Sequence, residues 1–119
     1  MEFVLTYNMP AEVYERNARP ENVEAAMAPW KLFYDAMAAE GVLRGGNRLD
    51  ALAGTSVRQR GGKRQVQDGP FAESKELLGG FALIEVPSLD HALRWAERAP
   101  SSLTGTTQVY PVIPIPERR

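Results

Sequence analysis

The sequence predicts a single α+β domain with a ferredoxin-like sandwich, in which two helices cover one face of an antiparallel sheet. The first observation is length, because 119 residues suffice for one domain and hardly for two, so we expect one domain over 1–119. The second is the order of local patterns, which reads strand, helix, strand, then a β-hairpin, then strand, helix, strand. The third is composition, since 44% hydrophobic and 24% charged residues are ordinary for a soluble globular chain.

Alternating side chains predict the first strand over residues 2–7, and because both of its sides are fairly apolar we expect it near the middle of the sheet. Residues 8–22 carry prolines and charges, which predicts a long loop with one helical turn. Residues 23–40 have helical spacing, and Gly41 supplies the left-handed stop. Pro29 either kinks this helix or restarts it from a first turn. We expect core packing rather than a ligand site from its stripe of Val23, Met27, Trp30, Phe33, Tyr34 and Met37.

The middle of the chain predicts a strand and a hairpin. Residues 42–49 read as a strand, and the pair Gly45 and Gly46 inside it indicates a bulge or a close approach of two backbones. Residues 55–60 and 63–67 flank two glycines, which is typical of a tight hairpin turn. Both hairpin strands are very polar, so we expect the hairpin to expose one face or to project from the body.

The last third predicts a strand, a helix and a strand. Residues 80–86 form the most hydrophobic stretch and read as a central strand. Ser88 can cap a helix that runs to about Arg98. We expect this helix to bury the stripe Leu89, Ala92, Leu93 and Ala96. A final strand over about 107–113 contains Pro111, which favours a sheet edge or a bulge.

Composition excludes several classes of protein. Fourteen basic against 15 acidic side chains give a net charge of −1, which argues against a nucleic-acid binder. The chain has no cysteine, so thiolate catalysis and thiolate metal sites are excluded. Its one histidine, His91, rules out a multi-histidine metal site, and we expect no metal and no cofactor. We place His91 and Trp95 on the outer side of the last helix, where Trp95 marks an interface or a pocket rim.

The N-terminus has no basic region followed by an apolar core, and no window approaches the length of a transmembrane helix, so we expect no membrane association and a cytoplasmic location. Helices on one sheet face leave the other face uncovered in a monomer. The strands over 2–7 and 80–86 are apolar on both sides, and burying apolar surface is worth ~25 cal/mol per Å². We therefore expect a homodimer in which two sheets face each other.

A charged loop between the hairpin and the central strand is the candidate site. Asp68 or Glu73 could act as a general base there, and Lys75 could orient an anionic oxygen. The alternative is architectural: Asp68 accepts backbone N–H groups of the turn, Glu73 and Lys75 form a surface pair, and Phe71 fills the core. We take Asp68, Glu73 and Lys75 as the candidate catalytic residues. The candidate substrate-binding residues are Tyr7, Arg48, Arg58 and Phe71.

The run from Asp68 to Phe81 resembles the signature of the YCII-related proteins of the DGPF type. The resemblance extends over nearly the whole chain: residues 39–49 look like the family's end of the first helix and second strand, 56–62 like its hairpin, and 88–100 like its second helix. It implies a ferredoxin-like dimeric α/β barrel. Shorter relatives carry a His–Asp pair involving the first helix, whereas this chain has residues such as Trp30 there, so that pair is not carried over.

Two functions follow from the resemblance together with the loop chemistry. In the first, the dimer binds a small molecule and acts as an acid/base lyase or isomerase through the loop carboxylates. This function is proposed by analogy with lactone isomerases and a dehydrochlorinase of similar fold. In the second, the protein is a non-enzymatic partner of an extracytoplasmic-function sigma factor, since many DGPF-type proteins look associated with such factors.

Overall fold

The computed structural model describes residues 1–71 and 75–116. None of the helices in these two ranges is long and apolar enough to cross a membrane. The helices are α1 (Ala11–Asn17), α2 (Val23–Ala39), the short 3₁₀ turn η1 (Ala51–Ala53), α3 (Leu89–Arg98) and α4 (Ser101–Thr104). The strands are β1 (Glu2–Met9), β2 (Leu43–Arg48), β3 (Thr55–Arg60), β4 (Lys63–Asp68), β5 (Leu77–Glu85) and β6 (Thr106–Pro111).

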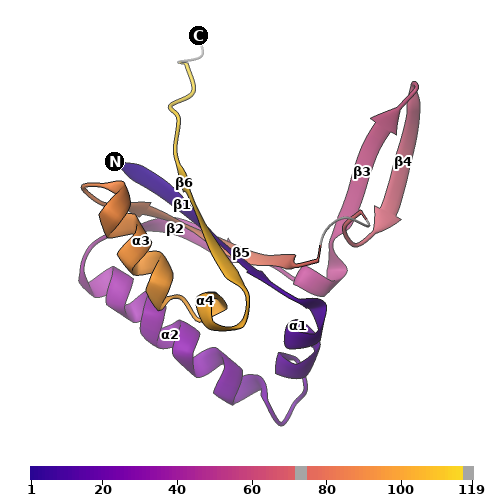
Figure 1. Cartoon of the computed structure of the whole chain (residues 1–119). Coiled ribbons are helices and arrows are strands. Elements are labelled where there is room, and N and C mark those ends of the chain that lie inside the picture. Colours follow the sequence, from indigo (N-terminus) through magenta and orange to yellow (C-terminus); the bar gives the residue numbers. More distant parts are fainter. Residues whose placement is uncertain (72–74, 117–119) are drawn as a thin grey trace.

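The main sheet confirms the predicted ferredoxin-like sandwich. Its strand order is β2-β5-β1-β6, and every neighbouring pair is antiparallel. The two most apolar strands, β1 and β5, are central, and β6 with its Pro111 lies at an edge, as predicted. Figure 1 shows α2 and α3 side by side on one face of this sheet.

The core lies between that face and the helices. On β1, Phe3, Leu5 and Tyr7 are buried, and their partners on β5 continue the same layer. Successive side chains of a strand point to opposite faces, so this alternation places one whole side of both strands against the helices. Phe33 and Met37 of α2 pack into the same cluster, which makes the C-terminal half of α2 its anchored part.

Helix α2 runs continuously from Val23 to Ala39, so Pro29 does not begin a second helix. Gly41 has a φ of 69° and ends the helix in the left-handed conformation, as predicted. Only the second half of α2 is well covered, because Val23 and Met27 in its first half are 42% and 38% exposed. The predicted core packing is therefore wrong for Val23 and Met27, at the beginning of α2, whereas Trp30 packs against Tyr7 of the central strand.

The β3–β4 hairpin, which we call the arm, is inserted between the adjacent strands β2 and β5. Its two strands form a sheet of their own, and Gly61 and Gly62 at its tip have φ values of 59° and 76°. Both positive angles suit the tight turn predicted for the hairpin. The arm projects away from the body (Figure 1), which confirms one of the two predicted arrangements.

The prediction for residues 8–22 was only partly right. The first strand extends to Met9, and α1 forms two turns where one was expected. Tertiary contacts explain the difference, because Val13 of α1 is buried and the Tyr14 hydroxyl donates a hydrogen bond of 2.8 Å to the backbone oxygen of Leu77. Pro10 lies just before the helix, where its missing N–H removes no helical hydrogen bond.

The face of α3 that was predicted to be buried is only partly correct. Ala92 and Ala96 are buried, but Leu89 and Leu93 are 50% and 48% exposed. The two alanines form the centre of the contact with the sheet, and Leu93 lies about 100° around the helix from Ala92. Trp95 lies on the other flank, toward α2, where it is half-buried against the aromatic core rather than on the outer side.

The paired glycines of β2 confirm both predicted features. The register with β5 shifts between Leu43 and Gly45, which is a bulge. Gly46 has a φ of 142°, and a Cβ there would come within 2.9 Å of the Ala82 Cα and meet the Phe81 carbonyl oxygen. A side chain at Gly46 would therefore be strained in conformation and would collide with the central strand.

Replacing Gly46 by alanine should lower the free energy of unfolding by more than about 2 kcal/mol, because strain and a backbone clash add. The control is Gly45→Ala, since nothing lies within 4 Å of a Cβ at Gly45 and its φ is not positive. Urea denaturation followed by circular dichroism measures the free energy of unfolding of both variants. Equal losses of unfolding free energy in the two variants would show that the close approach of Gly46 to β5 does not affect stability.

Candidate functional site

The structure places the sequence-predicted site residues on several elements. Asp68 ends β4 at the base of the arm, and its exposed carboxylate accepts no hydrogen bond from any residue in the described ranges. Lys75 is also exposed, and Glu73 lies outside the described residues. Arg48 ends β2 opposite Gly80 and is exposed.

Among the residues that the structure describes, the predicted Arg58 and Phe71 contact each other. The guanidinium carbon of Arg58 lies 3.3 Å from the centre of the Phe71 ring. Such stacking combines cation–π attraction with packing of the planar guanidinium. Phe71 is half-buried by this contact, so it lies in the arm's base and not in the main core.

Hydrogen bonds from backbone and side-chain donors hold the Asp-Gly-Pro turn in place. The N–H of Gly69 donates to the Gly54 oxygen at 2.7 Å, and the Ser56 hydroxyl donates to the Gly69 oxygen at 2.7 Å. Gly69 has a φ of 76°, which favours glycine. The side chain of Gln67 donates to the Pro70 oxygen at 2.6 Å. This part of the loop closes the base of the arm.

The glycines that end the charged loop have a packing role. A Cβ at Gly79 would lie 2.6 Å from the Tyr14 ring, and one at Gly80 would lie 3.3 Å from the Tyr7 ring. Both positions therefore make room for tyrosines that cross the strand. Tyr14 hydrogen-bonds to the Leu77 oxygen there, which fastens α1 to the beginning of β5.

Tyr7 lies in the core beneath α2, opposite Gly80 at the end of the loop. Its hydroxyl is 2.9 Å from that of Tyr34, and its ring packs edge-on against Trp30 at 4.7 Å between centroids. Burial raises the pKa of Tyr7 and of Tyr34 above the ordinary value, and it raises the pKa of Tyr14 to about 12. All three hydroxyls thus stay protonated near neutral pH.

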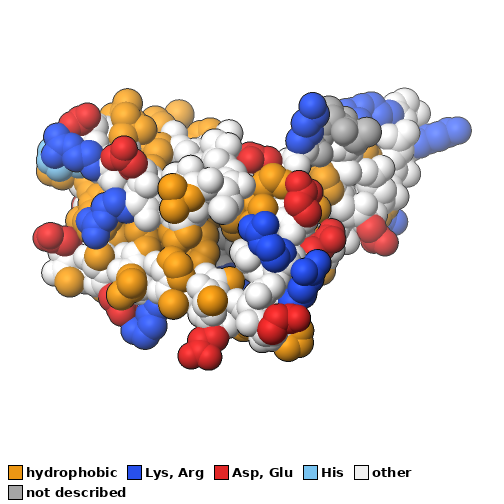
Figure 2. All heavy atoms as spheres, turned by 60° about the horizontal axis from the view of Figure 1, so that its bottom comes forward, with side chains coloured by type: hydrophobic (Ala, Val, Ile, Leu, Met, Phe, Trp, Pro, Cys, Tyr) orange, Lys and Arg blue, Asp and Glu red, His pale blue; other side chains and the backbone are white. Residues whose placement is uncertain are grey.

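A cavity of about 430 Å³ lies in the helical layer, between α1 and the first half of α2 on one side and α3 and α4 on the other. Figure 2 shows hydrophobic side chains over the middle of this face of the molecule. The apolar lining includes Met9, Trp30, Phe33, Pro100 and Leu103. The polar lining consists of Arg16, Asn17, Arg98 and Thr104. Its volume is within the range of small-molecule sites, about 300–1,000 Å³.

Small residues open this cavity. Ala26 and Pro29 face it from α2, where larger side chains would fill it. On the other side, α4 ends at Gly105, where a Cβ would come within 2.8 Å of the Met9 Cα. Glycine therefore lets α4 turn back against the end of β1, and the Thr104 hydroxyl lies 3.0 Å from the Met9 sulfur. The cavity forms where α4 and α2 diverge above that strand end.

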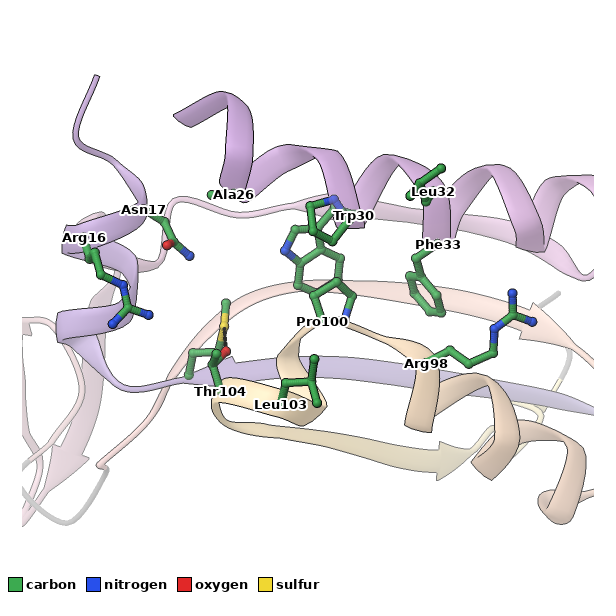
Figure 3. A pocket seen from close by; sticks show the side chains of 12 residues that line it. Arg16, Asn17, Ala26, Trp30, Leu32, Phe33, Arg98, Pro100, Leu103 and Thr104 are labelled. Carbon is green, nitrogen blue, oxygen red and sulfur yellow. Dashed lines mark hydrogen bonds between the residues drawn. The ribbon is translucent and has the colours of Figure 1, made fainter. Parts of the chain in front are cut away.

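The two arginines lie at opposite ends of the lining in the view of Figure 3, with Trp30 and Pro100 between them. Arg98 stacks on Trp95 with its guanidinium carbon 4.4 Å from the ring centre. A smaller hollow of about 200 Å³ borders the same arginine and is lined by His91, Arg94, Trp95 and Arg98. In the described ranges, no group of three histidine, aspartate or glutamate side chains could hold a metal ion.

Sequence reasoning missed this cavity. Arg16 and Asn17 lie at the end of α1, where the sequence predicts a loop with only one helical turn. The signal for the longer helix is the apolar Val13 followed by a tyrosine. Of the stripe weighed as a ligand site, Trp30 lines the cavity whereas Met37 is fully buried in the core. The apolar stripe therefore serves both the core and the cavity wall.

Comparison with known proteins places the chain in a family. The model of the YCII-related domain matches residues 1–116. An uncharacterized protein of Rhizobium meliloti (strain 1021), R00369, is 46% identical over 67 residues, which cover 56% of this chain and 53% of the relative, so the match spans about half of the relative's length. The 5-chloro-2-hydroxyhydroquinone dehydrochlorinase TftG from Burkholderia phenoliruptrix AC1100 has a similar fold, with a TM-score of 0.50 and 16% identity over 95% of this chain and 94% of TftG. This chain belongs to the YCII-related family.

Proposed function

We propose that the protein binds a small organic molecule in the cavity between its helices, in each copy of a homodimer. The observation that carries this proposal is the cavity of about 430 Å³ with a mixed lining of aromatic and cationic side chains. Apolar walls supply affinity through surface burial, and a few polar groups supply orientation. No carboxylate or histidine of the described residues lines the cavity, so its described lining suits binding rather than acid/base chemistry.

The related fold supports a ligand of this size. The solved structure of TftG is a complex with 2,5-dihydroxybenzoquinone, a small cyclic compound. The ferredoxin-like sandwich of this chain offers a comparable scaffold, although fold alone does not determine a ligand. A cyclic ligand with an apolar ring is compatible with the half-buried Trp30 in the cavity wall.

The homodimer is proposed from the sheet face opposite the helices. Register places Leu83, Val4 and Tyr110 in one row on that face, and all three are at least partly exposed. Val57 and Val66, which are paired on the arm, are 63% and 50% exposed. An isolated two-stranded hairpin is marginally stable, so the arm needs a surface to pack against. A second copy meets both needs by symmetry.

Filling the cavity should abolish binding. In Ala26→Trp a large ring enters the space, whereas Ala28→Trp on the exposed side of α2 serves as the matched control. Saturation-transfer NMR with a set of small cyclic compounds should give signals for the unchanged protein and the control, reduced at least tenfold in Ala26→Trp. Unreduced signals in Ala26→Trp, or no compound that binds the unchanged protein, would refute the cavity as a binding site.

A charge on the open sheet face should break the dimer. Leu83→Lys places an ammonium in the proposed interface, where its desolvation would be unfavourable. Sedimentation equilibrium should give twice the chain mass for the unchanged protein and the single mass for Leu83→Lys. Leu89→Lys, on the helix side, should stay dimeric, since Leu89 is already 50% exposed. A monomeric unchanged protein would refute the proposal.

Catalysis by Asp68, Glu73 and Lys75 stays a prediction, as does the alternative of a sigma-factor partner. The catalytic role implies that Asp68→Asn abolishes turnover of a lactone or enolisable substrate. Its urea midpoint should not change, because the carboxylate is exposed and makes no hydrogen bond to a described residue. Asp35→Asn, an exposed position on α2, is the control. Full turnover by well-folded Asp68→Asn would exclude the role.

A further inference from the structure

We infer that the ligand of the helical cavity is an amphipathic carboxylate, held at its charged end by Arg16 and along its apolar body by Trp30 and Leu103. This inference rests on the proposed function, and it adds the chemical class of the ligand. The first observation is the sign of the charge. Among the described residues, the charged side chains in the lining are the arginines Arg16 and Arg98, and no described aspartate or glutamate lines the cavity.

The second observation is that the Arg16 guanidinium has no partner among the described residues. Within the described ranges its guanidinium makes no ion pair, no hydrogen bond and no ring contact. Arg98 differs, because it already stacks on Trp95. A guanidinium offers paired N–H donors whose geometry matches a carboxylate, so an incoming anion would form two parallel hydrogen bonds with Arg16.

The third observation is that other polar side chains line the cavity near Arg16. Asn17 lies beside it at the same end of the cavity, and Thr104 lies across from it in Figure 3. The Asn17 amide can donate to an oxygen, and the Thr104 hydroxyl can donate once it turns from the Met9 sulfur. These three side chains form the polar end of the site. Arg98, at the other end, contributes long-range attraction for an anion rather than the main contact.

The rest of the cavity suits an apolar body. Trp30 is half-buried and lies between the two arginines in Figure 3, and its ring is fixed by the contact with Tyr7. Leu103 faces the cavity from α4 and is 89% exposed, so a bound ring would cover it. A neutral hydrophobic ligand would gain the same burial but would leave the guanidiniums without a charged partner.

Three matched pairs of compounds test the inference: benzoate, cyclohexanecarboxylate and 2-naphthoate, each against its own amide. Each pair keeps the apolar body and changes the charge. Isothermal titration should show tighter binding for the carboxylates by about tenfold, and the difference should shrink at high salt. Arg16→Gln should weaken the carboxylates about tenfold and leave the amides unchanged.

The control is Arg19→Gln, which removes one positive charge from the same end of the molecule at a position outside the cavity lining. It should change none of the affinities more than about twofold. Arg98→Gln should weaken the carboxylates less than Arg16→Gln does. Equal affinity for carboxylates and amides would overturn the inference and leave the proposed function standing. Binding of neither class would overturn both.

Discussion

The antiparallel pairing of β1 with β5 is the constraint on which the rest of the structure depends. It sets Phe3 opposite Ile84 and Leu5 opposite Ala82, and all four side chains are buried beneath the helices. Because side chains alternate along a strand, the same register sends the other half of both strands to the second face. A slip of one residue would place Thr6 in the core and expose its apolar neighbours.

The pairing creates two sheet faces: one is covered by helices and borders the cavity, and the other is the proposed dimer contact. The helical face is closed over most of its area, but α2 and α4 diverge above the end of β1 and leave a cavity. The opposite face has no helix on it within the described ranges, and its partly exposed Leu83 and Tyr110 favour a second copy there. In the proposed dimer the cavities remain accessible, because the contact uses the other side of the sheet.

Local signals in the sequence were sufficient for the six strands, the two main helices and the topology. Apolar runs identified the two central strands, paired glycines identified the bulge in β2 and the tip of the arm, and Ser88 identified a helix start, where its hydroxyl accepts the His91 N–H. The failures have a common cause, because α1 and the orientation of α3 depend on tertiary contacts. The cavity could not be predicted, since residues near position 16 and residues near position 100 look ordinary in sequence and meet only in the folded chain.

The signature loop and the cavity are thus different places in the fold. The Asp-Gly-Pro turn of the loop closes the base of the arm and its Gly79 makes room for Tyr14, whereas the cavity lies in the helical layer. A crystal structure of the protein soaked with 2-naphthoate tests this distinction most directly. We predict that the rings lie between Trp30 and Leu103 with the carboxylate at Arg16. Rings seated instead beside Arg58 and Phe71, on the loop, would contradict it.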